Sequence, residues 1–409
     1  MDRLLLLLPT TTYRTEDFLD AARALGVEVV CAAERPSTLE ALAPDNLLTL
    51  DFRDPARAAE QAAEFARTHP LAAVVGVDDL TTVAAAAIAE RLGLRSNSAG
   101  AAAAARNKLE ARRRFGAAGV PQPRYRTVPL DADPAAAARA VEYPCVLKPL
   151  ALSASRGVIR ADDPAQLVAA FHRIAAILRR ADTSPDGDAA RVLLAEEFVP
   201  GREVALEGLL RTGTLETLAL FDKPDPLDGP FFEETIYVTP SRLPDAVQAR
   251  VRQVGQDACK ALGLVEGPVH AELRVNERGP WVLEVAARSI GGLCSRTLRF
   301  GTGMTLEEVI LRHALDWPIA SLTREGRAAG VMMLPIPRAG RLRATRGTEA
   351  AADVPGIEEV AITAHLEQEL VPLPEGWQYL GFVFARAETP AAVEAALREA
   401  HARLAFDIV

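Results

Sequence analysis

The sequence predicts a mixed fold, with an α/β unit at the N-terminus followed by α+β units. Over residues 1–98, short apolar runs alternate with helical patterns, which is typical of a parallel sheet in a Rossmann-like arrangement. Three breakers in "GVPQP", residues 119–123, predict an extended entry into a new unit. Strand patterns dominate residues 192–241, and they return in the last ~80 residues before a final helix.

The first unit is expected to contain four parallel strands. Their apolar runs are Leu4–Leu8, Val27–Ala32, Asn46–Leu50 and Leu71–Val77. Asp54 and Pro55 suit the cap and the first turn of a helix, so one helix is expected to begin there. The segment "PTTTYRT" after the first strand has no glycine, which argues against a dinucleotide-binding loop.

Further along, helical patterns and turn formers alternate with strands. The expected helices are 164–180, 244–262 and 390–405, and "DTSPDGDA", residues 182–189, reads as a loop. We therefore expect three domains: 1–98, 99–325 with a lid subdomain at about 121–200, and an α+β domain at 326–409.

Composition limits the partners and the compartment. The formal net charge of -9 argues against a nucleic-acid partner. Leu4–Leu8 is too short for a signal-peptide core or a membrane span. The four cysteines have no CxxC spacing, so neither a zinc site nor a disulfide framework is indicated, and a reduced cytoplasm is expected. The oligomeric state stays open, and a homodimer is only the commonest assembly.

A predicted hairpin at residues 267–288 carries the most informative acidic residues. If the loop is Glu277–Gly279, Asn276 pairs with Pro280 and Glu272 lies directly opposite Glu284. Like charges in that position destabilise a sheet, so a divalent cation such as Mg²⁺ is expected between them. The alternative is a solvated strand face on which Glu272 pairs with Arg274 or Arg288.

Strand periodicity assigns neighbours to this pair. His270, Arg274 and Asn276 should share the face of Glu272, and Ala286 and Arg288 that of Glu284. The side chain of Arg288 is long enough to reach back toward a bound anion. His270 is expected to contact substrate or to orient Glu272.

Lys148 ends an apolar strand and precedes a loop of small residues. A fixed cation followed by hydroxyls and flexible backbone amides suits a phosphate group. The loop residues concerned are Ser153, Ser155, Arg156 and Gly157. The alternative is a lysine that merely extends from a strand end into solvent.

Residues 193–208 suggest a nucleotide-base site. The strand ends in Glu196, Glu197 and Phe198, continues through Val199, and resumes at Glu203 after a turn. Extended backbone beside an aromatic ring and glutamates can bind a purine edge and ribose hydroxyls. An acidic turn between two strands is the alternative.

Taken in order, these motifs resemble the ATP-grasp superfamily over residues 1–320. The ordered set is "RNKLEAR" with Lys108, "GVPQP", Lys148 with its loop, "EEFVPGRE", and the hairpin with two glutamates and an arginine. "DKPDPLDGPFFEETIYVTPS", "HAELRV" and "EVAARSIGG" are most similar to the L-amino-acid ligases. The last ~80 residues resemble the C-terminal domain of those ligases less distinctly.

The resemblance implies a fold and a set of roles. The fold is a Rossmann-like domain, an ATP-grasp fold and a small C-terminal α+β domain. Lys108 and Lys148 would face phosphates, with residues 151–157 as a lid. Glu196 and the Val199 backbone would bind adenine, and Glu203 would bind the ribose. Glu272 and Glu284 would bind the metal. Arg288 would stabilise negative charge, and Glu234 would bind the substrate amino group.

The implied activity is ATP-dependent joining of a carboxylate to an amine through an acyl phosphate, with Mg²⁺, or Mn²⁺ in its place. Gly291 and Gly292 would leave room for the acceptor, although a plain turn explains them equally. Two departures stand out: Ala286 replaces a metal-binding asparagine, and Ala154 replaces a lid glycine. The rivals are a bicarbonate-activating carboxylase of the biotin-carboxylase type and a nucleotide-binding protein without catalysis.

Overall fold

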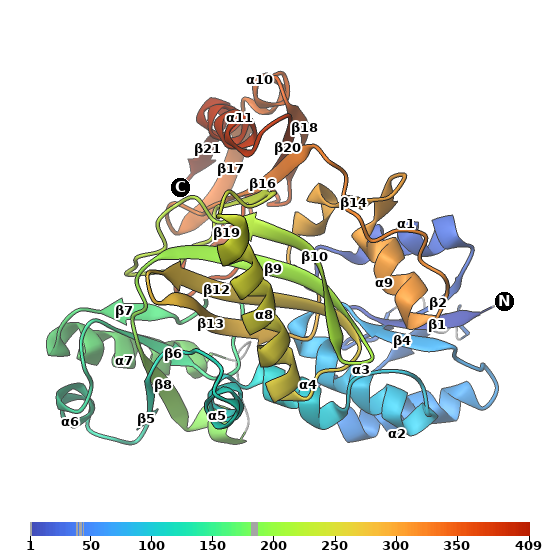
Figure 1. Cartoon of the computed structure of the whole chain (residues 1–409), viewed down its shortest axis with the longest axis horizontal. Helices are drawn as coiled ribbons and strands as arrows, with labels where there is room; N and C mark the ends of the chain where they lie inside the picture. Colours follow the sequence, from blue (N-terminus) through green and yellow to red (C-terminus); the bar gives the residue numbers. More distant parts are fainter. Residues whose placement is uncertain (1, 38–39, 41–42, 44, 181–186) are drawn as a thin grey trace.

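The computed structural model describes residues 2–37, 40, 43, 45–180 and 187–409. The predicted loop at 182–189 therefore falls outside the described residues as far as residue 186. Figure 1 shows three groups of elements around one large central sheet, with the N-terminal strands at one side and the C-terminal helices at the top. No helix among the described residues is both long and apolar enough to span a membrane.

The N-terminal elements confirm the expected α/β alternation. All strands of the sheet are parallel, in the order β3-β2-β1-β4, which is a Rossmann-like order. The cap prediction is also confirmed, since Asp54 accepts a hydrogen bond from the Arg57 N–H at the start of α2. The elements are β1 (Arg3–Leu7), α1 (Thr15–Leu25), β2 (Glu28–Ala33), β3 (Leu47–Thr49), α2 (Pro55–Ala66), β4 (Ala73–Gly76) and α3 (Asp79–Leu92).

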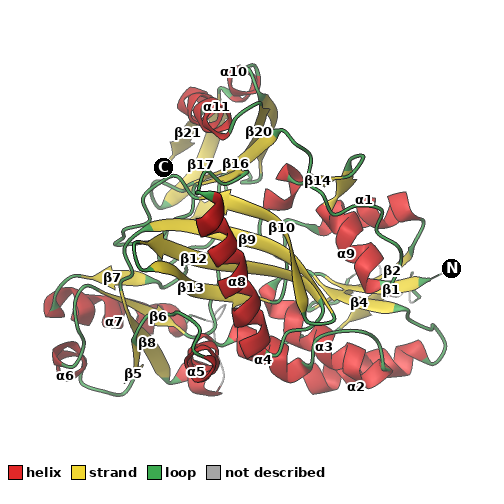
Figure 2. Cartoon of the chain, in the orientation of Figure 1, coloured by secondary structure: helices red, strands yellow, loops and turns green. Residues whose placement is uncertain are grey.

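Two short helices lead into a small antiparallel sheet. The strand order is β5-β8-β6-β7, with α6 and α7 packed beside it (Figure 2). β6 is buried along its whole length because Cys145 and Leu147 face the core beneath α7. The elements are α4 (Ala99–Arg106), α5 (Lys108–Ala118), β5 (Tyr125–Pro129), α6 (Pro134–Arg139), β6 (Cys145–Pro149), β7 (Ile159–Ala161), α7 (Pro164–Leu178) and β8 (Val192–Glu197).

The central sheet has eight strands, in the order β13-β12-β9-β10-β11-β16-β20-β18. The helix α8 runs across one face of it (Figure 1), where Val251, Ala258 and Leu262 pack against the strands. The elements are β9 (Arg202–Arg211), β10 (Thr214–Asp222), β11 (Ile236–Thr239), α8 (Asp245–Leu262), β12 (Gly267–Asn276), β13 (Gly279–Ala286), β14 (Arg299–Phe300), β15 (Met304–Thr305) and α9 (Leu306–Ala314).

The C-terminal residues extend the same sheet. β16 pairs with β11, so the sheet continues across the expected boundary near residue 326, while α11 and a three-stranded sheet complete the unit. We retain 1–98, 99–325 and 326–409 as proposed domains. The elements are β16 (Ala328–Leu334), β17 (Gly340–Arg346), α10 (Thr348–Ala352), β18 (Ile357–Ile362), β19 (Glu369–Leu370), β20 (Gly381–Ala387), α11 (Pro390–Arg403) and β21 (Ala405–Ile408).

Candidate active site

One cavity of about 740 Å³ lies where the N-terminal unit, the small sheet, the central sheet and the C-terminal unit meet. It is lined by almost every residue that the sequence singled out. These are Lys108, Lys148, Ser153, Ser155, Arg156, Glu196, Glu197, Phe198, Val199, Glu203, Glu234, His270, Glu272, Glu284, Arg288, Gly291 and Gly292. Gly157, the last residue of the lid loop, is the exception, and a Cβ there would lie 3.2 Å from the Pro149 side chain.

Glu272 and Glu284 are direct partners across the β12–β13 hairpin, as predicted, but the predicted loop is wrong. Asn276 pairs with Gly279, so two residues rather than three separate the paired ends of the strands. A bulge then adds one residue to β13, since Leu273 pairs with Val282 while Glu272 pairs with Glu284. The bulge offsets the shorter loop and returns both carboxylates to one face.

Arg112 of α5 holds this bulge in place. No sequence pattern had indicated a role for Arg112. Its guanidinium donates to the main-chain oxygens of Val282, at 3.2 Å, and Leu283, at 2.6 Å. It also pairs with Glu196 at 2.6 Å, and its side chain is buried. One arginine therefore ties the β8 glutamate to the strand that carries Glu284.

Lys148 lies beside Glu196 rather than in open solvent. Its Nζ is 2.5 Å from Glu196 Oε2, and both side chains are buried. Burial lowers the pKa of Lys148, and the attraction of Glu196 opposes that effect. Burial alone would raise the pKa of Glu196, but Arg112 and Lys148 outweigh it and hold this pKa below its usual range.

Lys108 connects the lid loop to the glutamate pair. From the first turn of α5, its Nζ donates to the Leu152 carbonyl at 2.8 Å and lies 3.2 Å from Glu284 Oε2. The two lysines expected at phosphates thus face one cavity, each already beside a carboxylate.

The lid loop adopts a backbone that glycine usually supplies. Ala154 and Ser155 both have positive φ, of 53° and 54°, which costs roughly 1–2 kcal/mol per residue. Contacts from the C-terminal unit hold the loop in place. The Gly157 N–H donates to the Pro374 carbonyl at 2.9 Å, and Arg156 Nε donates to the Glu375 carbonyl at 2.9 Å.

Lys223 is a second residue that the sequence did not indicate. Carboxylate oxygens of Glu203, Glu234 and Glu272 lie within 4.8 Å of one another, and the Lys223 ammonium contacts all three glutamates. The remaining oxygen of Glu203 pairs with Arg274 Nε at 3.0 Å. Lys223 thus supplies the positive charge for this acidic cluster.

Two carboxylates of the cluster, those of Glu234 and Glu272, have pKa values shifted in opposite directions. Burial, and then the negative charge of Glu272, raise the pKa of Glu234 to about 7 despite Lys223. For Glu272, burial is outweighed by Lys223 and His270, which hold its pKa well below the usual range. Glu272 is therefore ionised at neutral pH, while Glu234 gains and loses a proton close to pH 7.

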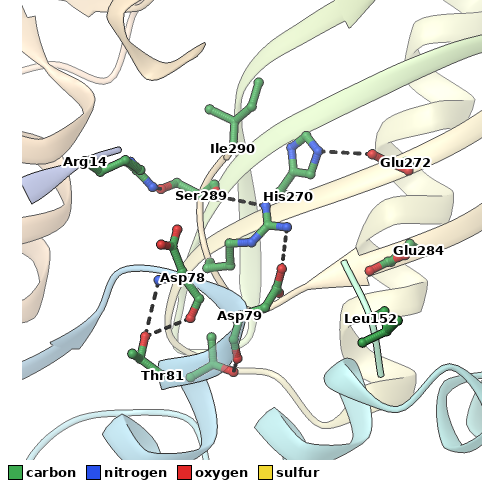
Figure 3. Close-up of polar contacts among 12 residues, drawn as sticks. Arg14, Asp78, Asp79, Thr81, Leu152, His270, Glu272, Glu284, Ser289 and Ile290 are labelled. Atoms are coloured by element: carbon green, nitrogen blue, oxygen red, sulfur yellow. Dashed lines mark hydrogen bonds and ion pairs between the residues drawn. The ribbon is translucent and has the colours of Figure 1, made fainter. Parts of the chain in front are cut away.

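His270 lies between Glu207 and Glu272. Its two expected roles, contact with substrate and orientation of Glu272, both stay predictions. Its Nδ1 is 3.1 Å from Glu207 Oε2. On its other side, Nε2 is 3.6 Å from Glu272 Oε1 (Figure 3). Burial lowers the pKa of His270, but the nearby carboxylates of Glu207 and Glu272 outweigh it and raise the value to about 9.

Arg288 extends from the end of β13 toward the N-terminal unit. Its Nη2 lies 2.8 Å from Asp79 Oδ2 in the first turn of α3, and its Nη1 donates to the Ser289 carbonyl at 3.0 Å. Burial opposes the charge of Arg288, but Asp79 overrides it and raises the pKa above the usual value. Asp79 is a third site residue that the sequence did not indicate.

The expected base-binding segment is well ordered by arginines. The guanidinium carbons of Arg160 and Arg274 lie 4.1 Å and 5.0 Å from the centroid of the Phe198 ring. The Val199 carbonyl accepts a hydrogen bond from Arg274 Nη1 at 3.1 Å. Glu197 points to the rim, where it pairs with Arg124 at 2.6 Å.

The two glycines after Arg288 differ in their surroundings. Gly291 has open space where a side chain would begin. Gly292 has a φ of +59°, and a Cβ there would lie 2.8 Å from the Phe382 ring. Packing therefore explains Gly292, whereas Gly291 leaves room in the cavity.

The donor set fits a hard divalent ion. Glu272 and Glu284 provide only oxygen ligands, they lie opposite each other, and both line the cavity beside Lys108. Ala286 provides no third ligand, although it lines the same wall.

Parts of the chain match known protein families in sequence. The ATP-grasp domain pattern matches residues 141–297, and the ATP-grasp N-terminal domain pattern matches 19–95. A D-alanine–D-alanine ligase of Gloeobacter violaceus is 30% identical over 240 residues, which cover 54% of this chain and 72% of that protein. The chain belongs to the ATP-grasp family. Its last residues, 332–409, match L-amino acid ligase C-terminal domain 2.

Other ATP-grasp ligases are also similar to this chain in sequence or in structure. The alanine–anticapsin ligase of Bacillus subtilis is 28% identical over 62% of this chain. This ATP-grasp chain spans 56% of the length of that curated relative. The L-amino acid ligase from Bacillus licheniformis has the same fold, with a TM-score of 0.80, 23% identity, and coverage of 100% of this chain and 99% of that one.

Proposed function

We propose that the chain is an ATP-dependent carboxylate-amine ligase that joins an amino-acid carboxylate to an amine, with release of ADP and phosphate. One observation carries the proposal: Glu272 and Glu284 lie opposite each other and face the cavity that also holds Lys108, Lys148 and Arg288. Fixed cations around a carboxylate pair suit phosphoryl transfer, which needs positioning and charge stabilisation rather than a nucleophilic side chain. The alanine–anticapsin and L-amino acid ligases among the relatives support this reaction type.

The nucleotide would lie between the small sheet and the central sheet. Lys108 and Lys148 would face its phosphates, beneath the lid loop with Ser153 and Ser155. Glu196 and the Val199 backbone would meet adenine, with Glu197 and Phe198 at the edge of that site, and Glu203 would meet the ribose. Mg²⁺, or Mn²⁺ in its place, would be held by Glu272 and Glu284, and would neutralise phosphate charge when bound.

The reaction would have two steps. A carboxylate oxygen of the first substrate attacks the γ-phosphorus, the bond from that phosphorus to the bridging oxygen breaks, and ADP leaves. The amine nitrogen then attacks the acyl carbon, the carbon–oxygen bond to phosphate breaks, and the nitrogen loses a proton. Arg288 would stabilise the negative charge that develops on oxygen in both steps. Glu234 would bind the amino group of the first substrate.

The test is phosphate release from ATP and Mg²⁺ with pools of amino acids. The ligase predicts release that needs two amino acids and yields an amide product, detected by mass spectrometry. Dependence on bicarbonate would favour a carboxylase instead. ATP binding without turnover would favour a binding protein. Glu284→Gln should abolish release while the protein stays folded, whereas Glu277→Gln, at the exposed hairpin tip, should not.

A further inference from the structure

Aromatic residues gather in one part of the cavity. The chain has only five tyrosines and three tryptophans, yet Tyr13, Tyr237, Tyr379 and Trp377 all line it. Tyr13 follows β1, Tyr237 lies on β11, and the other two precede β20. Three regions distant in sequence thus contribute these four rings, which we call the aromatic wall, to the cavity lining, and this is a substantial concentration for a chain with 5% aromatic residues.

Packing fixes the rings of this aromatic wall. The Tyr13 ring meets the Phe382 ring edge-on, with centroids 5.3 Å apart, and the Tyr379 ring lies 5.9 Å from the same phenylalanine. The Tyr379 N–H also donates to the Tyr13 hydroxyl at 3.4 Å. Phe382 is completely buried, so the wall is preformed.

The aromatic wall adjoins Glu234 and Lys223. The Lys223 ammonium lies 5.0 Å from the Tyr237 ring centroid. Burial, and then the negative charge of Glu234, raise the pKa of both Tyr237 and Tyr379 well above the usual value, so both phenols stay neutral near that carboxylate. Met333 and Cys294 add apolar surface in the same region.

The geometry of an α-amino acid connects these features. Its ammonium, carboxylate and side chain all leave one carbon atom. If the ammonium binds Glu234 and the carboxylate lies toward Arg288, the side chain has to point toward a third wall. From this arrangement we infer that the carboxylate-donating substrate is an amino acid with a large, uncharged apolar side chain, aromatic or comparable in size, which packs against Tyr237, Tyr379 and Trp377.

Trp377 is the residue of the aromatic wall best suited to substitution. It is partly exposed and lies on the loop whose Pro374 and Glu375 carbonyls bind the lid loop. Removing its ring should enlarge the side-chain site without emptying a buried core. A matched control is Trp317, which is also partly exposed, but whose indole N–H bonds Asp2 away from the cavity.

The inference rests on the proposed ligase activity, so the experiment measures both. Phosphate release and product mass are followed with ATP, Mg²⁺ and each of phenylalanine, methionine, alanine and lysine as the carboxylate donor, with a mixture of amines. We expect kcat/KM for phenylalanine to exceed that for alanine by about 10- to 100-fold, the discrimination that a few buried methylene equivalents provide. Trp377→Ala should lower this ratio at least about fivefold, and Trp317→Ala should leave it unchanged.

Each outcome decides one question. No turnover with any donor would overturn the ligase proposal. Turnover that is as fast with alanine as with phenylalanine, or fastest with lysine, would overturn the side-chain inference while the ligase proposal stands. An unchanged ratio in a folded Trp377→Ala variant, checked by its thermal unfolding, would also overturn it.

Discussion

Glu272 and Glu284 lie opposite each other because a one-residue bulge in β13 offsets a hairpin loop that is one residue shorter than expected. Two carboxylates opposite each other in a sheet repel, and a cation between them removes that repulsion. The Arg112 guanidinium holds the bulge through two carbonyl oxygens. The position of this carboxylate pair is therefore a property of tertiary structure as well as of the hairpin.

Removal of either carboxylate should weaken metal binding. We predict that Glu272→Gln and Glu284→Gln each lower Mn²⁺ affinity in the presence of ADP by about tenfold or more, since even supporting residues of metal sites contribute 10- to 100-fold. Electron paramagnetic resonance of free Mn²⁺ measures this without turnover. Glu277→Gln, on the same hairpin, is the control, and equal affinities in all the variants would refute the assignment.

Arg112 and Glu196 should be coupled in stability. Arg112→Met leaves a buried carboxylate with only Lys148 as its partner, so we expect a loss of about 3–5 kcal/mol in the free energy of unfolding. The double variant Arg112→Met/Glu196→Gln should lose less than the sum of the two single variants. Urea denaturation of the four proteins measures the difference, and strictly additive losses would contradict the coupling.

Asp79 should position Arg288. Asp79→Asn keeps a hydrogen-bond acceptor but removes the charge that holds the guanidinium, so we predict a fall in kcat of about tenfold with little change in KM for ATP. Arg288→Ala should abolish turnover in a folded protein. Asp54→Asn, at the cap of α2, is the control. A purely structural role for Asp79 would instead lower the melting temperature and leave kcat unchanged.

A buried ion pair joins the N-terminal unit to α9 and predicts sensitivity to acid. Arg14 Nη2 lies 2.8 Å from Glu307 Oε1, and both side chains are buried. Burial would raise the pKa of Glu307, but Arg14 outweighs it, so the folded pKa lies below the unfolded value of 4.5. The stabilisation is therefore complete above about pH 4.5 and is lost as the pH falls through the folded pKa.

Glu307→Gln tests that dependence. The variant should be less stable than the parent at pH 7, and the gap in the free energy of unfolding should narrow as the pH falls from 5 toward 3. Denaturant titrations at several pH values measure the gap. A gap that is constant or widens toward low pH would show that Glu307 is not the group that titrates.

The sequence predicted what local patterns encode. Alternating apolar runs located the N-terminal strands, Asp54 and Pro55 located a helix start, and the acids flanking the hairpin located the glutamate pair. The sequence did not predict the bulge, because Leu283 is one of several apolar residues in this strand and nothing marks it as the extra one. Lys223, Arg112 and Asp79 were missed since their partners lie 11 to 209 positions away along the chain, so no local spacing marks them.

The central claim is that a substrate carboxylate is activated as an acyl phosphate. The most direct measurement uses phenylalanine labelled with ¹⁸O in its carboxylate, together with ATP, Mg²⁺ and the amine that supports turnover, followed by mass spectrometry of the released phosphate. Activation through an acyl phosphate predicts one ¹⁸O atom in each phosphate formed with the amide. Unlabelled phosphate would contradict it, because the γ-phosphoryl group would then have passed to water rather than to the amino acid.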